Sequence, residues 1–111
     1  MIDDLKKKTE EGLKTLKETA QDFAFNVEKQ ARIGKRRYVD ITKLERSVQG
    51  LFGEIGAYVY DEATSGRQVK NGDPYVKERI ETITAMKSEI RAIEDEISEI
   101  ELTHPPKRLD E

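Results

Sequence analysis

The amino-acid sequence predicts an all-α protein in which two long helices form an antiparallel coiled-coil hairpin. Two stretches carry apolar residues at alternating steps of three and four, which is the pattern of a buried helical seam. Between them, residues 64–74 are rich in the turn residues Gly, Asn and Pro, as expected for a short connection between antiparallel helices. Charged residues make up 39% and hydrophobic residues 35% of the 111-residue chain, a balance typical of long helices that bury one stripe. The predicted hairpin seam consists of Ile41, Leu44, Val48, Leu51, Ile55, Tyr58, Ile83, Met86, Ile90, Ile93, Ile97 and Ile100.

The second helix of the hairpin is expected over residues 74–102. Asp73 can accept a hydrogen bond from an unpaired backbone N–H at the start of this helix, and Pro74 suits the first helical position. The helix has to stop before Pro105 and Pro106, because proline cannot extend a helix and restricts the residue before it. Residues 104–111 are therefore expected to form a flexible tail.

The first helix is expected to be much longer, over residues 3–64. Near its start, nine apolar residues lie within an arc of about 100° on a helical wheel, whereas Phe25 and Ile33 fall outside that arc. The junction with the hairpin holds a single glycine, Gly34, and an isolated glycine is tolerated within a helix. A turn near Gly34, which would give a three-helix bundle, is the alternative. The nine residues, here called the arm stripe, are Ile2, Leu5, Leu13, Leu16, Ala20, Phe23, Ala24, Val27 and Ala31.

This pattern predicts a single helical domain over residues 1–103. Within it we expect an N-terminal helical arm at residues 1–35 and the helical hairpin at residues 36–102.

Three glycines lie close together in the first helix, although each costs about 1 kcal/mol relative to alanine in a helix interior. On a helical wheel they lie opposite the hairpin seam, beside one alanine and one tyrosine. Small residues let two helix backbones approach closely, so we predict a second helix-packing face here. The alternative is that the glycines only bend an exposed helix. This glycine face consists of Gly50, Gly53, Gly56, Ala57 and Tyr60.

A long first helix would leave the arm stripe uncovered by its own chain. Large exposed apolar surfaces mark interaction sites, and a twofold dimer, in which each arm lies against the other chain's glycine face, is the economical solution. In the three-helix bundle, the chain's own N-terminal helix would cover that face instead. We therefore expect a homodimer, together with an unidentified protein partner.

The segment ARIGKRRYVDITKLERSVQGLFGEIGAYVYDEA, followed by a turn and an isoleucine-rich helix, resembles a group of short bacterial proteins of unknown function. The resemblance covers residues 27–102. It implies a helical hairpin with the small-residue pattern of residues 51–56 and an aromatic residue near Tyr58 or Tyr60. Some relatives add a cysteine-based zinc ribbon after the hairpin. This chain has no cysteine, so no ribbon function carries over, and the resemblance implies no catalytic or binding residues.

Few residues of this chain could carry chemistry. The single histidine, His104, lies in the proline-rich tail, where nothing is expected to orient it as a base or a metal ligand. No nucleophile paired with a base, phosphate-binding loop or set of metal ligands is present. We therefore predict that the protein is not an enzyme and that it uses no cofactor or metal. An acidic run fits the solvated face of a coiled coil better than a cation site; it consists of Glu94, Asp95, Glu96, Glu99 and Glu101.

The distribution of charge limits the choice of partner. Residues 1–37 carry ten basic and seven acidic side chains, whereas residues 75–111 carry six and ten, and such asymmetry can set the direction of helix pairing. It is too small for nucleic acid, whose phosphates need a concentrated basic face. The basic cluster at residues 32–37 spreads around a helix and is expected to be solvated, with an anionic partner or a lipid headgroup as the alternative.

Together, these observations favour a non-enzymatic helical scaffold or adaptor that acts through helix–helix contacts between proteins. The alternative is a peripheral membrane protein whose residues 2–31 lie on an anionic bilayer, although the acidic residues and alanines of that segment disfavour membrane contact. No apolar run approaches the roughly 20 residues that a spanning helix needs. The N-terminus also lacks the apolar core of a signal peptide, and we therefore expect a cytoplasmic protein.

Overall fold

The fold is seen in a computed structural model that describes residues 2–106, with residues 2–4 described for their backbone alone. Its elements are helix α1 (Ile2–Gly34), the π-helical segment η1 (Lys35–Asp40), helix α2 (Ile41–Thr64) and helix α3 (Pro74–Glu101). The first three follow one another without a break and are together called the long helix. The predicted all-α hairpin is thus confirmed. The alternative turn near Gly34 is wrong, because this residue has helical backbone angles of φ −60° and ψ −44°.

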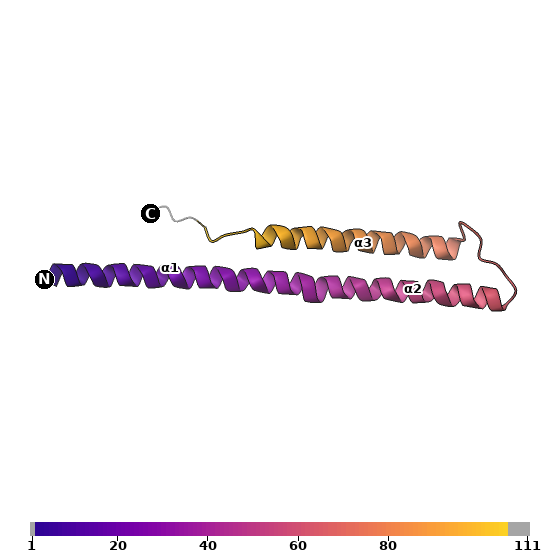
Figure 1. The fold of residues 1–111 in the computed structure, drawn as a ribbon, viewed down its shortest axis with the longest axis horizontal. Helices are drawn as coiled ribbons and strands as arrows, with labels where there is room; N and C mark the ends of the chain where they lie inside the picture. The colour runs from indigo at the N-terminus through magenta and orange to yellow at the C-terminus, as the bar shows by residue number, and fades with distance from the viewer. Residues whose placement is uncertain (1, 107–111) are drawn as a thin grey trace.

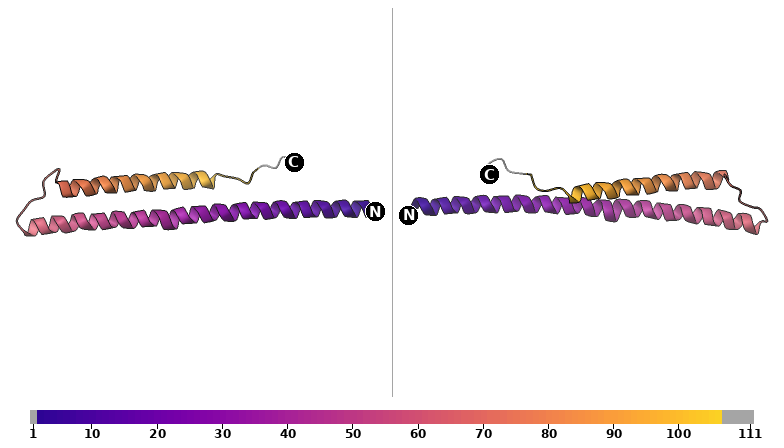
Figure 2. Two further views of the ribbon diagram at one scale, coloured as in Figure 1. Left: turned by 180° about the vertical axis from the view of Figure 1, so that it is seen from behind. Right: turned by 45° about the horizontal axis from the view of Figure 1, so that its top comes forward.

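The molecule is a rod with extents of 96 × 20 × 11 Å. α3 runs back alongside α2, antiparallel to it, after a short connection at one end of the rod (Figure 1). The N-terminal part of α1 extends well beyond the end of α3, and both views in Figure 2 show it without a neighbouring helix in the described part of the chain. Most of the arm predicted from the sequence is therefore a free-standing length of helix.

The connection between α2 and α3, at residues 65–73, contains two turns that depend on glycine. α2 ends in a Schellman motif, in which the Arg67 N–H donates to the Glu62 carbonyl across Gly66. Gly66 has φ +76° and Gly72 has φ +80°, a left-handed conformation that costs other residues free energy. These turns reverse the chain tightly and aim α3 back along α2.

α3 begins as the sequence predicts. Oδ1 of Asp73 accepts hydrogen bonds from the backbone N–H groups of Tyr75 and Val76 at 2.9 and 3.3 Å, and Pro74 occupies the first helical position. These bonds satisfy donors that every helix N-terminus leaves unpaired. The helix ends at Glu101, before the two prolines that prevent its extension.

The core is a row of β-branched aliphatic side chains between the helices. Its members are 4–7% exposed, and none of the described side chains is less than 2% exposed. Two helices alone can enclose only their line of contact, so the core is one side chain wide. The buried residues are Ile33, Ile41, Val48, Ile83, Ile93, Ile97 and Ile100.

The π-helical segment η1 allows this core to continue from α2 into α1. Ile33 and Ile41 belong to one core cluster, but they lie eight residues apart, one more than a heptad. In an uninterrupted α-helix that spacing would turn them about 80° away from each other. Here the Ile41 N–H bonds to the carbonyl of Arg36, five residues back, and this wider turn accommodates the extra residue. Both isoleucines therefore face α3.

Because of η1, pairing with α3 begins before residue 36, where the sequence places the start of the hairpin. The Lys29 ammonium donates to the carbonyl oxygens of Glu101 and Thr103 at 2.8 and 2.9 Å. Ile33 falls outside the arm stripe on the helical wheel for the same reason, since it lies on the α3 side of the long helix.

Candidate functional site

The predicted hairpin seam lies between α2 and α3. Six of its twelve residues are buried and the other six are partly buried. These side chains hold the two helices together and leave little apolar surface for a partner. A surface that could bind another molecule therefore has to be sought on the other sides of the helices.

The arm stripe lies in water along α1. Its five large apolar side chains that the structure describes range from 52% exposed at Val27 to 72% exposed at Leu5, and its three alanines are exposed as well. The side chain of Ile2 lies outside the described residues. A row of exposed apolar side chains of this length on a protein surface is typical of an interaction site.

The glycine face is also exposed at all five of its residues. A Cβ atom added to Gly50, Gly53 or Gly56 would meet no atom of another segment within 4 Å. No helix in the described part of the chain therefore packs against these glycines. The predicted packing of this face against a helix stays a prediction, and it now concerns a helix from a second molecule.

The arm stripe and the glycine face lie on the same side of the long helix. We take as zero the direction in which Ile33 of α1 and Val48 of α2 face α3. At about 100° per residue, the five large arm residues then lie at roughly 80–160° and the glycine face at roughly 80–200° in the same rotational sense. The segment η1 is needed for this alignment, because it lets Ile33 and Val48 face the same helix. The two surfaces thus form one exposed outer face, which extends from Leu5 to Tyr60.

A cluster of polar and aromatic contacts closes the connected end of the hairpin. The Tyr58 hydroxyl donates to Oδ2 of Asp73 at 2.7 Å, and the rings of Tyr58 and Tyr75 stack with centroids 4.4 Å apart. The Arg79 guanidinium lies 3.3 Å from the centroid of the Tyr75 ring and pairs with the Glu54 carboxylate at 3.1 Å. These contacts join α2 to the first turns of α3, and the sequence alone predicted only the helix cap at Asp73.

The hydrogen bond between Tyr58 and Asp73 moves the two pKa values apart. Accepting this bond, and then the bonds from the Val76 and Tyr75 N–H groups, lowers the pKa of the Asp73 carboxyl below its ordinary value of 3.8. The same bond, followed by partial burial, raises the pKa of Tyr58 to about 12. Asp73 therefore stays ionised and Tyr58 stays neutral across the neutral range, which suits a fixed structural contact better than proton transfer.

The basic cluster at residues 32–37 meets the acidic run where α3 ends. The Arg36 guanidinium lies 3.0 Å from the Asp40 carboxylate and 2.9 Å from that of Glu96, and Arg37 pairs with Glu101 at 3.0 Å. The hydrogen bond to Asp40, and then the charge of Glu96, raise the pKa of Arg36. Such exposed pairs contribute little to stability one by one, but together they fix which part of α3 lies beside η1. The sequence treated both clusters as solvated surfaces, because periodicity does not show that they meet.

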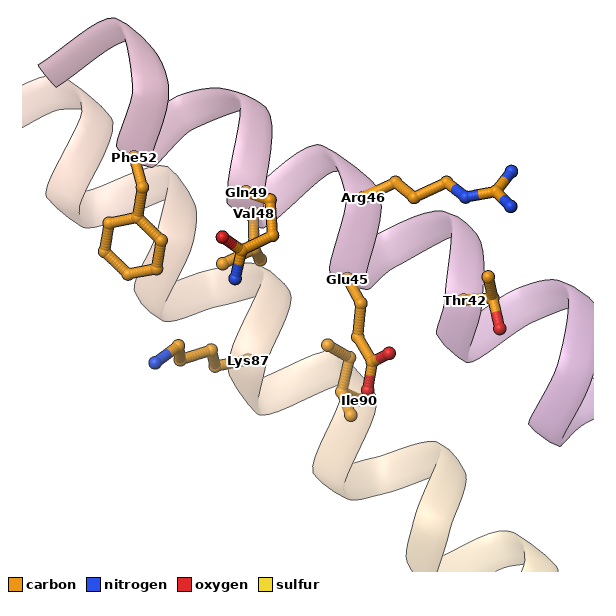
Figure 3. A pocket seen from close by; sticks show the side chains of 8 residues that line it. All are labelled: Thr42, Glu45, Arg46, Val48, Gln49, Phe52, Lys87 and Ile90. Atoms are coloured by element: carbon orange, nitrogen blue, oxygen red, sulfur yellow. The ribbon is translucent and has the colours of Figure 1, made fainter. Parts of the chain in front are cut away.

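A groove of about 590 Å³ lies between α2 and α3 (Figure 3). Phe52 forms part of its wall at 43% exposure, and the Lys87 ammonium lies 5.4 Å from the centroid of the Phe52 ring. The Arg46 side chain points away from α3 in this view. Polar residues of both helices line the groove, among them Glu45 and Gln49 of α2 and Lys87 of α3.

His104, in the described part of the predicted tail, is exposed, and residues 107–111 of that tail lie outside the described part. No three potential metal-ligating side chains come together among the residues that the structure describes. None of the helices, over the same residues, combines the length and the apolar character needed to cross a bilayer.

Comparison of the chain with protein-family models, with curated proteins and with solved structures found no match. The resemblance to short bacterial hairpin proteins therefore stays a prediction. The candidate functional site is accordingly defined by the surface of the molecule itself, and the outer face of the long helix is its most extensive feature.

Proposed function

We propose that this protein is a non-enzymatic helical scaffold or adaptor that binds another helix along its outer face. The observation that carries the proposal is the exposure of the arm stripe, whose five large side chains are each more than half exposed. Full burial of a single side chain of this kind contributes about 1.5–3 kcal/mol. A partner that covers the row would therefore gain several such contributions at once.

The form of the outer face supports a helix as the partner. It is long, straight and narrow, and it combines large apolar residues in the arm with glycines and an alanine in α2. Helices pack on one another by placing the side chains of one into the spaces on the other. A compact domain would touch only a short part of such a strip, whereas a helix can follow it along its length.

Affinity capture from the source cell tests the proposal with two matched variants. Leu16→Glu/Phe23→Glu introduces two charges into the arm stripe. Thr15→Glu/Asn26→Glu introduces the same charges at exposed positions of the same helix that point away from the stripe. Because all four positions are exposed, both variants should keep their helical circular dichroism.

We expect the parent and the control variant to capture the same protein, and the stripe variant to lose it. Equal capture by all three would contradict the proposal. Co-sedimentation with phosphatidylserine vesicles should show no binding at physiological salt. Binding that the stripe variant alone abolishes would instead favour the peripheral membrane protein. The expected cytoplasmic location stays a prediction.

A further inference from the structure

We infer that the outer face is covered by a second copy of this chain, which lies antiparallel to the first so that the arm of each molecule follows α2 of the other. This inference rests on the proposed function, because it names the partner of the surface proposed there. It starts from the apolar arm stripe, which no described part of the same chain covers. Three further observations then point to a second copy.

The first observation is that the large and small residues of the outer face match in spacing. Leu13 and Leu16 are three residues apart, as are Gly53 and Gly56. In an antiparallel pair, Leu16 lies on Gly53 of the partner subunit when Leu13 lies on Gly56 of the partner subunit. Both leucines are more than half exposed and the space over both glycines is open, so the leucines can fill it while the two backbones approach.

The same alignment superimposes the two long helices almost completely. The position midway between residues 16 and 53 falls between Gly34 and Lys35, close to the middle of the long helix, which spans residues 2–64. A twofold axis at that point makes each leucine–glycine contact occur twice. Each arm stripe is then covered from Leu5, opposite Thr64 of the partner subunit, to Ala31, and the assembly closes as a dimer.

The second observation is that charges on one flank of the outer face become complementary in this alignment. Lys6 and Glu28 of the arm, and Lys43 and Asp61 of α2, all lie at roughly 180–220° from the direction of α3, and all four are exposed. The dimer brings Lys6 beside Asp61 of the partner subunit and Glu28 beside Lys43 of the partner subunit, although Glu10 on the same flank also lies near Asp61 of the partner subunit. A parallel pair in register would instead turn this flank towards the opposite flank of the partner, so these four charges would not meet.

The third observation is the size of the contact. A strip about 10 Å wide, the diameter of a helix, and about 90 Å long covers roughly 900 Å² on each chain. Both sides together give roughly 1,800 Å², which lies within the range of stable protein–protein interfaces. A second copy thus supplies enough contact area without any additional partner.

Cysteine cross-linking tests the alignment directly, because the parent chain contains no cysteine. Ala20→Cys and Gln49→Cys place thiols at exposed positions of the outer face that lie opposite each other in the antiparallel dimer. Within one chain these positions are about 44 Å apart along a continuous helix. A disulfide needs Cα atoms about 4.4–6.8 Å apart, so any bond between them joins two molecules.

We expect mild oxidation to convert the double variant into a covalent dimer, while each single variant stays uncross-linked. The parent should also sediment at twice the chain mass at micromolar concentration. A covalent dimer from Ala20→Cys alone would overturn the inference, because residue 20 meets its own copy only in a parallel pair or in an antiparallel pair centred on residue 20. A non-covalent dimer that the double variant fails to cross-link would overturn it too, because the alignment would then be different.

The failure of this inference can be told apart from failure of the proposed function. A parent chain that sediments as a monomer, while the arm-stripe variant still loses its captured protein, overturns the second copy and leaves the helical adaptor standing. A dimer cross-linked as expected, combined with capture that does not depend on the arm stripe, supports the inference and removes the evidence for an adaptor.

Discussion

Replacement of Ile93 by alanine, with Ile80→Ala as the matched control, tests whether the row of isoleucines holds the hairpin together. Both residues lie in α3, and both changes remove the same atoms. They differ in environment, because Ile93 is 6% exposed within the core cluster and Ile80 is 52% exposed. Neither residue lies on the long helix, so a dimer through the outer face would affect both variants equally.

The expected effects follow from burial and from the thinness of the rod. Isoleucine-to-alanine changes in a core cost about 2–5 kcal/mol, through lost transfer free energy and the cavity left behind. With a shortest extent of 11 Å, neighbouring side chains can close part of that cavity, and alanine's better helix propensity returns a few tenths of a kcal/mol. We therefore expect Ile93→Ala to lower the free energy of unfolding by about 2 kcal/mol. Ile80→Ala removes about half as much buried surface and should cost about 0.5 kcal/mol.

Urea denaturation followed by circular dichroism measures both values. The two variants should share one slope of free energy against urea concentration and differ in midpoint, because both remove contacts without changing the surface exposed on unfolding. Equal losses of stability in the two variants would refute the assignment of Ile93 to the core. A loss of less than about 1 kcal/mol at Ile93 would show that the single row of isoleucines is not what holds α3 in place.

Four further predictions concern the contacts of Tyr58 and Asp73 at the connected end of the hairpin, the glycine face and η1. Folding raises the pKa of Tyr58 from 10.0 to about 12. The stability that Tyr58 contributes should therefore be constant below pH 10 and be lost as the pH rises towards 12. Tyr58→Phe should remove both this loss of stability and a tyrosinate absorbance step near pH 12, and a step that persists in the variant would contradict the contact. Asp73 has a lowered pKa, so its stabilising effect should be lost as the pH falls below 3.8, and Asp73→Asn should flatten the acid limb of the urea midpoint plotted against pH. Gly53→Leu adds a side chain in open space and should stabilise the isolated chain by nearly 1 kcal/mol. It should also lower the affinity of the antiparallel dimer at least about tenfold by overpacking. A variant that still sediments as a full dimer would argue against close packing at that glycine. Deletion of Lys35 restores a seven-residue step between Ile33 and Ile41 and should leave the urea midpoint close to that of the parent, whereas deletion of both Lys35 and Arg36 should lower it.

Local chemistry made the hairpin predictable from the sequence. The cap at Asp73, the proline after it and the alternating steps of three and four each act within one turn or one heptad, so they can be recognised without knowledge of the fold. The length of the long helix was predictable for the same reason, since Gly34 stands alone among helix-forming residues.

The remaining contacts depend on the geometry of pairing, which no local pattern contains. Ile33 was missed as a core residue because a helical wheel assumes a constant turn per residue, and η1 departs from it. Its spacing of eight residues from Ile41 is the signal that could have revealed the π-helical segment. Tyr58 was expected in the seam from its spacing, but the reach of its hydroxyl to Asp73 depends on a connection with two left-handed glycines. The outer face could be outlined from periodicity, and only the structure showed that its two parts share one side.

The unbroken long helix also determines how far apart the protein can hold other molecules. A flexible chain of the same 63 residues would have a root-mean-square end-to-end distance of about 45 Å, with wide fluctuation around that value. As a helix the same residues reach about 95 Å, close to the full 96 Å extent of the rod. Anything attached near Leu5 would therefore be kept at a nearly constant distance from anything attached near Thr64. The long helix thus spans about twice the distance that its residues would cover if they were unstructured.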